Sequence, residues 1–268
     1  MSLEFHQIDA FTDQPFAGNP AIVYRLDCWL DEALMQRIAA EHNLAETAFV
    51  VKEGSAWHIR WFTPVSEVPL CGHATLAAAK VLFDIYREPA EVLDFNCLSG
   101  ALQVTRQGER LQLDFPVRRV ELVALPLHEQ AERALERQVE QVLALRNGDG
   151  SVQELMVVLG SEAELRELTP NLPALATLPG LGVLVTAGGQ KHDFVSRYFA
   201  PSIGINEDPV TGSTHCMLVP YWAERLGRTT LSAFQCSARG GELLCRLDGE
   251  RVKIAGHARH IASGQLML

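Results

Sequence analysis

The sequence Cys71-Gly72-His73-Ala74-Thr75 runs directly into an apolar segment, residues 76–83, and Glu207-Asp208-Pro209-Val210-Thr211-Gly212-Ser213-Thr214-His215 runs into another, residues 216–222. Each places backbone N–H groups and small side chains where a helix would begin. The first N–H groups of a helix have no partner inside it, so they can bind an anion such as a carboxylate. Two such stretches predict one substrate held between two related halves of the chain.

The segments around these two stretches follow one order: strands, a glycine motif, an apolar helix and more strands. We expect the two helices at about residues 73–86 and 212–226, and the first carries so few charges that we expect it to be buried on every side. Short turns between the strands favour antiparallel pairing. The sequence therefore predicts an α+β fold of two lobes, each a mostly antiparallel sheet wrapped around a central buried helix, with a cleft between the lobes.

Other segments give more local expectations. Residues 47–51 and 57–62 flank Gly54 and predict a pair of strands, while residues 116–126 indicate a connection between the lobes. Residues 127–145 carry charges on one side only, which predicts a single helix over that range.

The composition argues against several classes of function. The chain has 268 residues and a formal net charge of −10, which argues against a nucleic-acid or an anionic membrane surface as its partner. No stretch approaches the roughly 18 apolar residues of a membrane span, and the first residues show no signal-peptide pattern. We therefore expect a cytoplasmic protein.

Cysteine and histidine spacing gives no sign of a metal site. The six cysteines are scattered without a Cys-x-x-Cys pair, so we expect free thiols. The nearest histidine pair is His257 and His260, whose rings would point to opposite faces of an extended segment. The sequence therefore predicts no bound metal.

Seven short segments, spread over nearly the whole chain, carry a resemblance when they are taken in order. They are Asp9-Ala-Phe-Thr-Asp13, Phe16-Ala-Gly-Asn-Pro20, Asn43-Leu-Ala-Glu-Thr-Ala-Phe49, Arg60-Trp-Phe-Thr-Pro64, Leu70-Cys-Gly-His-Ala-Thr75, Glu207-Asp-Pro-Val-Thr-Gly-Ser213 and Arg239-Gly-Gly-Glu242. Together they resemble the phenazine-biosynthesis-like isomerase family, which is related to diaminopimelate epimerase.

The resemblance implies two lobes related by a pseudo-two-fold axis, with the active site in the cleft between them. The lobes would be residues 1–117 and 118–257, and a C-terminal tail at about 258–268 would return to the first lobe. Members of this family are usually homodimers that need neither a metal nor an organic cofactor. Their best understood reaction is a proton shift that isomerises a hydroxylated cyclohexadiene amino acid on the way to phenazines.

Glu46 and His73 are the leading candidates for proton transfer. Glu46 lies between apolar residues, where a carboxylate would be partly desolvated, which suits a group that takes a proton from carbon and returns it. His73 follows Gly72 at the helix start and could relay a proton or hydrogen-bond the substrate. A turn glutamate and a helix-start histidine satisfied by backbone are the structural alternatives. The resemblance implies that Glu46 is the catalytic acid/base and favours a functional role for His73.

The remaining candidates would bind or assist. Asp208 precedes a proline, so we expect an extended backbone there and a carboxylate able to bind a substrate amine or to assist Glu46 as a catalytic residue. Gly212 and Ser213 offer N–H groups and a hydroxyl to a carboxylate, Gly72 lets the backbone approach a ligand closely, and Asn19 could contact substrate. Helix capping and a simple turn are the structural alternatives.

Two rival functions stay open. Diaminopimelate epimerase and its racemase relatives use two cysteines, one at each glycine motif. Here Cys71 stands near the first position, whereas the second motif offers Asp208 and no cysteine directly before its glycine. One carboxylate that moves a proton on one face would give an isomerase rather than a racemase. The chain could also be a small-molecule binding protein without turnover.

Overall fold

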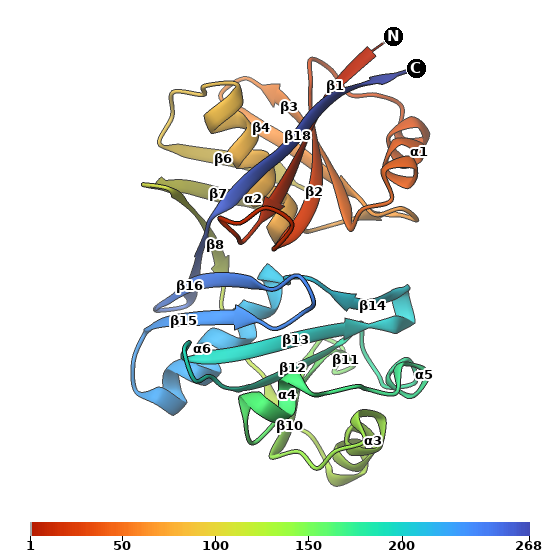
Figure 1. Cartoon of the computed structure of the whole chain (residues 1–268), viewed down its shortest axis with the longest axis vertical. Helices are drawn as coiled ribbons and strands as arrows, with labels where there is room; N and C mark the ends of the chain where they lie inside the picture. Colours follow the sequence, from red (N-terminus) through yellow and green to blue (C-terminus); the bar gives the residue numbers. More distant parts are fainter. Residues whose placement is uncertain (1) are drawn as a thin grey trace. The chain divides into compact units, whose positions relative to one another are not determined.

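A computed structural model describes residues 2–268 (Figure 1). The chain forms two compact units. Unit 1 comprises the residues up to Phe115 together with Lys253–Leu268, and unit 2 comprises Pro116–Val252. Within residues 2–268, no helix is both long enough and apolar enough to span a bilayer.

Unit 1 contains most strands of the first half of the chain and the strand that ends the chain. Its elements are β1 (Ser2–Ala10), β2 (Asn19–Leu26), α1 (Glu32–His42), β3 (Glu46–Glu53), β4 (Ala56–Phe62), β5 (Glu67–Val68), α2 (Gly72–Lys80), the π-helical turn η1 (Val81–Ile85), β6 (Val92–Cys97), β7 (Gly100–Gln107), β8 (Arg110–Pro116) and β18 (Ala258–Met267). The strand β17 (Arg251–Gly256) begins in unit 2 and ends in unit 1.

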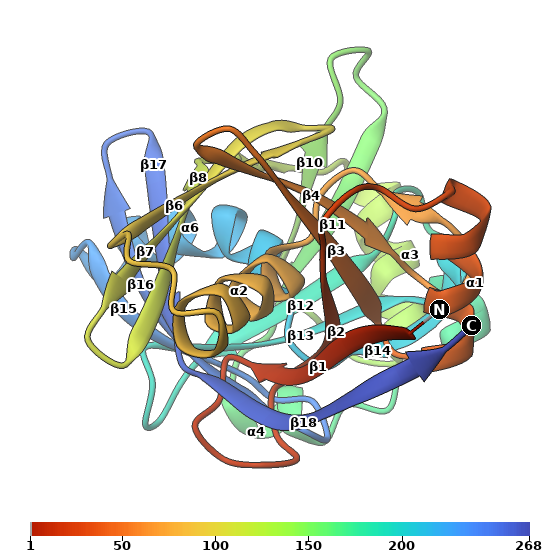
Figure 2. The same cartoon turned by 90° about the horizontal axis from the view of Figure 1, so that it is seen from above.

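The sheet of unit 1 wraps around α2, as the sequence predicts. Strands pair in the order β18–β1–β2–β3–β4–β6–β7–β8, and β5 adds to β4. Every residue from Gly72 to Ala79 is buried, because α2 packs against β1, β2, β3, β7 and β18 (Figure 2). The alanine-rich sequence of α2 lets strands approach on several sides.

The other face of this sheet carries α1. Ile22 and Tyr24 of β2 pack with Met35 and Ile38 of α1 in one apolar cluster. Asp31 caps α1 by accepting a hydrogen bond from the N–H of Ala33. β2 is therefore covered on both faces, which explains why it is apolar at nearly every position instead of alternating.

Unit 2 repeats this plan. Its elements are β9 (Glu121–Leu122), α3 (Leu125–Leu135), β10 (Gln141–Arg146), β11 (Val152–Val158), α4 (Glu162–Arg166), α5 (Leu172–Leu175), β12 (Val183–Gly188), β13 (Phe194–Ala200), the 3₁₀ turn η2 (Pro201–Ile203), β14 (Ile205–Asp208), the 3₁₀ turn η3 (Gly212–Thr214), α6 (His215–Leu226), β15 (Thr230–Gln235) and β16 (Gly241–Asp248). The predicted helix 212–226 is confirmed as η3 followed by α6, which ends at Gly227 with a left-handed backbone (φ 66°).

The predicted single helix over residues 127–145 is wrong. The helix α3 ends at Leu135, Glu136 takes a left-handed conformation (φ 53°), and the chain continues as strand β10. β10 pairs with β11 and β9, and Val142 and Ala144 enter the same core as α3. Long-range pairing therefore outweighs a helical pattern that was read across two adjacent elements.

The two units share one sequence of pairings. Each unit begins with an antiparallel pair (β1–β2, β10–β11), whose second strand pairs in parallel with the next strand (β3, β12). That strand pairs with an antiparallel strand (β4, β13), which also pairs with a short strand (β5, β14). A buried helix (α2, α6) follows, and the strand after it (β6, β15) pairs in parallel with β4 or β13. The expectation of mostly antiparallel sheets is confirmed. The parallel pairs occur where a helix lies between the two strands, as the geometry of such connections requires.

The repeat extends to individual residues. Arg60 forms two hydrogen bonds with Glu67 across β4 and β5, at 2.7 and 2.6 Å. Arg197 forms the same pair with Glu207 across β13 and β14, at 2.7 and 2.9 Å.

This match continues from the paired strands into the helix starts. Trp61 lies opposite Val68 in unit 1, as Tyr198 lies opposite Asp208 in unit 2. With this alignment, the residue before the first helical glycine is Cys71 in unit 1 and Thr211 in unit 2.

Candidate active site

The first part of the candidate site lies where α2 begins. Glu46 is the first residue of β3 and His73 the second residue of α2, and the ring Nε2 lies 3.0 Å from the carboxylate Oε2. Their side chains are only 14% and 5% exposed. The alternative of an exposed turn glutamate is therefore wrong, because Glu46 begins a strand next to a buried helix.

The other nitrogen of His73 also has neighbours. The Asn19 amide Nδ2 lies 3.2 Å from His73 Nδ1, and the Cys71 Sγ lies 3.5 Å from it. When the Asn19 amide donates to Nδ1, the ring proton of neutral His73 is on Nε2, facing Glu46. Asn19 is fully buried, so its contact with His73 makes it more than a turn residue.

Burial and neighbouring charge act in opposite directions on His73. Burial disfavours the imidazolium, but Cys71 and Glu46 together raise the pKa of His73 well above its usual value. Burial, and next the charge on Glu46, raise the pKa of the Cys71 thiol. A thiol with a raised pKa is uncharged near neutral pH, so we attribute the charge that favours the imidazolium to Glu46.

Glu46, Cys71 and His73 also have the geometry of metal ligands. One ligand atom from each lies within 4.8 Å of the others. Carboxylate, thiolate and imidazole are all zinc ligands. The absence of a bound metal therefore stays a prediction from the sequence.

The loop before β2 delivers Asn19 to this site. Gly18 has φ 66°, and a Cβ atom there would lie 2.2 Å from the carbonyl oxygen of Ala10. The buried carboxylate of Asp9 accepts a hydrogen bond from the Phe16 N–H at 3.1 Å, which ties the loop to β1. The Gly-Asn-Pro sequence is therefore needed for a close turn as well as for the asparagine.

The second part of the candidate site lies in unit 2, where β14 leads to α6. Asp208 is the last residue of β14, so its backbone is extended as predicted, and its carboxylate accepts a hydrogen bond from the Thr211 hydroxyl. The fully buried Gln235 donates to the Asp208 carbonyl and accepts from the Thr211 N–H, both at 2.8 Å. Sequence analysis missed Gln235, since nothing in the sequence of β15 shows that its last residue meets β14.

Gly212 and Ser213 form the turn η3 directly before α6. The seven predicted residues thus fall into two sets, each at the start of a buried helix. Asn19, Glu46, Gly72 and His73 lie together in unit 1, and Asp208, Gly212 and Ser213 lie together in unit 2.

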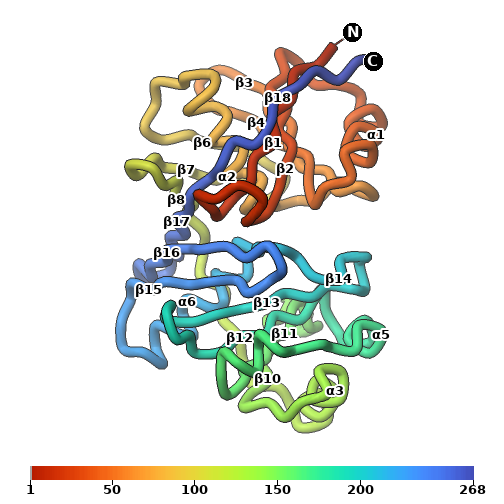
Figure 3. Tube along the Cα trace, in the orientation of Figure 1, coloured from red at the N-terminus to blue at the C-terminus, as the bar shows by residue number. Residues whose placement is uncertain are grey.

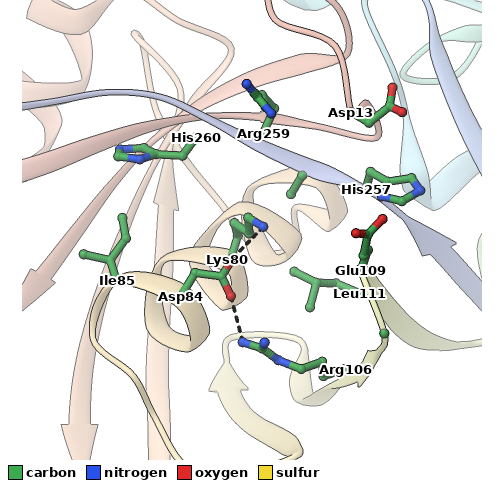
Figure 4. Close-up of a pocket in the computed structure, with 12 residues that line it drawn as sticks. Asp13, Lys80, Asp84, Ile85, Arg106, Glu109, Leu111, His257, Arg259 and His260 are labelled. Carbon is green, nitrogen blue, oxygen red and sulfur yellow. Dashed lines mark hydrogen bonds and ion pairs between the residues drawn. The ribbon is translucent and has the colours of Figure 1, made fainter.

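A pocket of about 590 Å³ in unit 1 is separate from these residues (Figure 4). It lies between the end of α2 and the segments around residues 106–111 and 257–260, and none of the seven predicted residues lines it. Lys80 and Arg106, which line it, both pair with Asp84, at 2.6 and 2.8 Å. Because none of the predicted residues lines this pocket, we place the candidate site at the helix starts.

The fold and site define a class: a duplicated α+β protein with a buried carboxylate–imidazole pair at a helix start. The chain belongs to the phenazine biosynthesis-like protein family, whose model matches residues 8–264. It is 59% identical to an uncharacterized isomerase of Pseudomonas aeruginosa and 48% identical to a second one, and each alignment covers the whole of both proteins.

Solved structures agree with this assignment. A phenazine biosynthesis protein of the PhzF family from Enterococcus faecalis is 48% identical with a TM-score of 0.93, and all of both chains is covered. A hydroxyproline epimerase from Agrobacterium vitis is 9% identical with a TM-score of 0.63, covering 99% of this chain and 92% of the epimerase, so it shares the fold alone. The predicted family and the predicted fold class are both confirmed.

Proposed function

We propose that this protein is a cofactor-independent isomerase that shifts a proton between two carbon atoms of a small carboxylated, amino-acid-like substrate. One observation carries this proposal: the Glu46 carboxylate lies 3.0 Å from the buried His73 ring, at the start of a buried helix. A carboxylate held in this way can accept a proton from carbon, and the adjacent imidazole can stabilise or relay it.

The proposed reaction needs no other reactant. Glu46 removes a proton as a C–H bond breaks, and the electron pair moves along the conjugated double bonds of the substrate. The proton on the Glu46 carboxyl group exchanges with solvent, and Glu46 then delivers a proton to a second carbon, where a new C–H bond forms. One base acting on one face therefore produces an isomer without net oxidation or reduction.

We propose that the residues at the start of α6 act on the same substrate. The N–H groups of Gly212 and Ser213 and the hydroxyl of Ser213 suit a carboxylate, as do the N–H groups that follow Gly72. Asp208 would bind the substrate amine or assist the proton transfer. Hydrogen bonds from Thr211 and Gln235 hold the Asp208 segment for this task.

The test is uptake of deuterium from D₂O, measured by mass spectrometry. The substrates are dihydro-hydroxyanthranilic acid and a panel of amino acids, each offered to the wild type and to Glu46→Gln. We expect the wild type to label one of them and Glu46→Gln to be slower by about 10²–10⁴-fold, the usual loss when a general acid/base is removed.

A matched control lies on the same strand. Glu53→Gln changes a carboxylate at the opposite, exposed end of β3. With this variant the substrate should take up deuterium at the wild-type rate. Equal labelling by wild type and by folded Glu46→Gln would remove Glu46 from the mechanism. Tight binding of a panel member without labelling would favour a binding protein instead.

A cysteine-dependent epimerase is the second candidate, and the 3.5 Å contact between Cys71 and His73 favours it. Two observations oppose it: the pKa of the Cys71 thiol is raised, and the matching position in unit 2 is Thr211. Alkylation that abolishes labelling in the wild type, but not in Cys71→Ser, would support a thiol at the site. Labelling that is unaffected by alkylation would count against a catalytic thiol.

A further inference from the structure

The repeat that relates the two units is broken at titratable side chains. Glu46 lies beside Ala21 across β2 and β3. At the matching place in unit 2, Glu154 of β11 and Gly182 directly precede the first β11–β12 pair, Leu155 with Val183. In unit 1 the carboxylate therefore lies on β3, whereas in unit 2 it lies on β11, the strand that corresponds to β2.

The next two strands differ between the units in another way. Trp61 and Val68 of unit 1 are replaced in unit 2 by Tyr198 and Asp208. The apolar residues Ala21, Trp61 and Val68 of unit 1 thus correspond to an acid–phenol–acid row in unit 2. This row runs from Glu154 through Tyr198 to Asp208.

Tyr198 contacts Glu154 directly. The phenol hydroxyl donates to the Glu154 carboxylate, with oxygen–oxygen distances of 2.9 and 3.2 Å. Both residues are less than a tenth exposed. A Cβ atom at Gly182 would lie 2.3 Å from the phenol oxygen, so only a glycine directly before β12 lets Tyr198 reach across to β11.

Tyr198 also faces Asp208. The two residues are directly opposite in the antiparallel pair β13–β14, which places their side chains on one face of the sheet. Burial raises the pKa of Tyr198, and the carboxylates of Glu154 and Asp208 raise it further. The phenol therefore remains protonated and available as a donor between two carboxyl groups.

Glu154 is the member of the row that can change charge near neutral pH. Burial raises the pKa of Glu154 to about 7, against the opposing effects of the Tyr198 hydrogen bond, the Arg118 charge and the N–H of Gly182. Arg118 itself donates to the side chain of Gln153 at 2.6 Å. Below this pH the carboxyl group is neutral, and above it the row carries one more negative charge.

We propose that Glu154 and Tyr198 are positioning residues of the candidate site, which set the electrostatic environment of Asp208 through the buried phenol. The effect of this environment on substrate binding rests on the proposed function, in which Asp208 binds the substrate amine. An ionised Glu154 adds negative charge behind Asp208, so a cationic amine binds more strongly above pH 7 than below it.

The first test needs no substrate. The carboxyl carbons are labelled with ¹³C and followed by NMR from pH 4 to 9, with Asp208→Asn and Glu154→Gln used to assign the two signals. In the wild type we expect the chemical shift of the Asp208 carboxyl carbon to change in a step near pH 7, over the same pH range as that of Glu154. Glu154→Gln should remove that step, and Tyr198→Phe should move the Glu154 midpoint upward, because the carboxylate loses its donor.

Tyr24→Phe is the matched control. Its phenol is also buried, but it lies 2.7 Å from His42 in unit 1. It should leave both titration curves unchanged. Two results would overturn the proposal: an Asp208 signal without a step near pH 7 in the wild type, or an Asp208 signal that still has this step in Glu154→Gln. If Tyr198→Phe fails to fold, the comparison of the wild type with Glu154→Gln is sufficient to test the proposal.

The second test uses the substrate that labels in D₂O. For the wild type we expect KM to fall roughly two- to fivefold between pH 6 and 8, as partly screened charges imply, with a smaller change in kcat. Glu154→Gln should abolish this pH dependence. Failure of the Glu46 experiment would leave the NMR result standing, so the two proposals fail separately.

Discussion

At the scale of single residues, His73 connects the candidate groups of unit 1. Its Nε2 faces Glu46, and its Nδ1 faces both Asn19 and Cys71. A substitution at any of these three neighbours therefore changes the protonation of the His73 ring. The site is therefore a small coupled network centred on the His73 ring, and in the proposed function Glu46 is the group of this network that takes the proton from carbon.

The charge on His73 makes a testable contribution to stability. Because the pKa of His73 is raised in the folded state, its ion pair stabilises the protein fully below the unfolded pKa of about 6.5 and is lost as pH rises through the folded pKa. We expect the unfolding free energy of the wild type, relative to His73→Gln, to fall between pH 6 and 9. Urea denaturation at several pH values measures it, and a constant or rising difference would contradict the assignment.

At the scale of elements, two arginine–glutamate pairs hold the strand pairs that lead into α2 and α6. Arg197 binds Glu207 with two hydrogen bonds and also donates to the carbonyls of Leu165 and Leu168, at 3.2 and 2.6 Å. Its side chain is 12% exposed, against 25% for Arg60. Arg197 is therefore the more buried of the two arginines and binds three groups, whereas Arg60 binds two, Glu67 and Glu32.

Substitution of these arginines should reflect that difference. We expect Arg197→Met to lower the unfolding free energy by about 2–4 kcal/mol, because it removes the donor to Glu207 and to the Leu168 carbonyl and one of the donors to the Leu165 carbonyl. Arg60→Met should cost roughly half as much. Arg197→Lys should not restore stability, since an ammonium cannot reproduce the planar two-bond contact. Urea denaturation compares the three variants, and equal losses for the two methionine variants would contradict this account.

At the scale of the whole molecule, unit 1 is completed by the end of the chain. The strand β18 pairs with β1 along nearly its whole length, and the two strands run side by side (Figure 3). Leu266 of β18 also packs against the apolar cluster shared by α1 and β2. Unit 1 therefore requires a segment made after unit 2, whereas unit 2 is continuous.

Removal of residues 258–268 should unfold unit 1 selectively. We expect limited proteolysis of this truncated protein to cut within unit 1 and to leave a resistant fragment of about residues 116–252, identified by mass spectrometry. Removal of only the exposed Met267 and Leu268 should leave the wild-type pattern. Full resistance of the longer truncation would mean that β18 does not stabilise unit 1.

The sequence by itself determined the fold class, the family and the candidate residues. The reason is local: a glycine, small polar residues and an unbroken apolar segment specify a buried helix start within about ten residues. The repeat of that pattern predicted two related units. The local pattern also misled, because α3 and β10 together mimic one helix and only pairing with β11 separates them.

Only the tertiary structure decided which side chains meet. The contacts of His73 join it to Asn19 and Glu46, which come from separate segments. Glu154 and Tyr198 are 44 residues apart in the chain, and they form a hydrogen bond because Gly182 has no side chain between them. Strand register creates these contacts, and register depends on pairing between distant segments. For the same reason the residue-level repeat became visible only once Arg60 with Glu67 and Arg197 with Glu207 could be aligned across their paired strands.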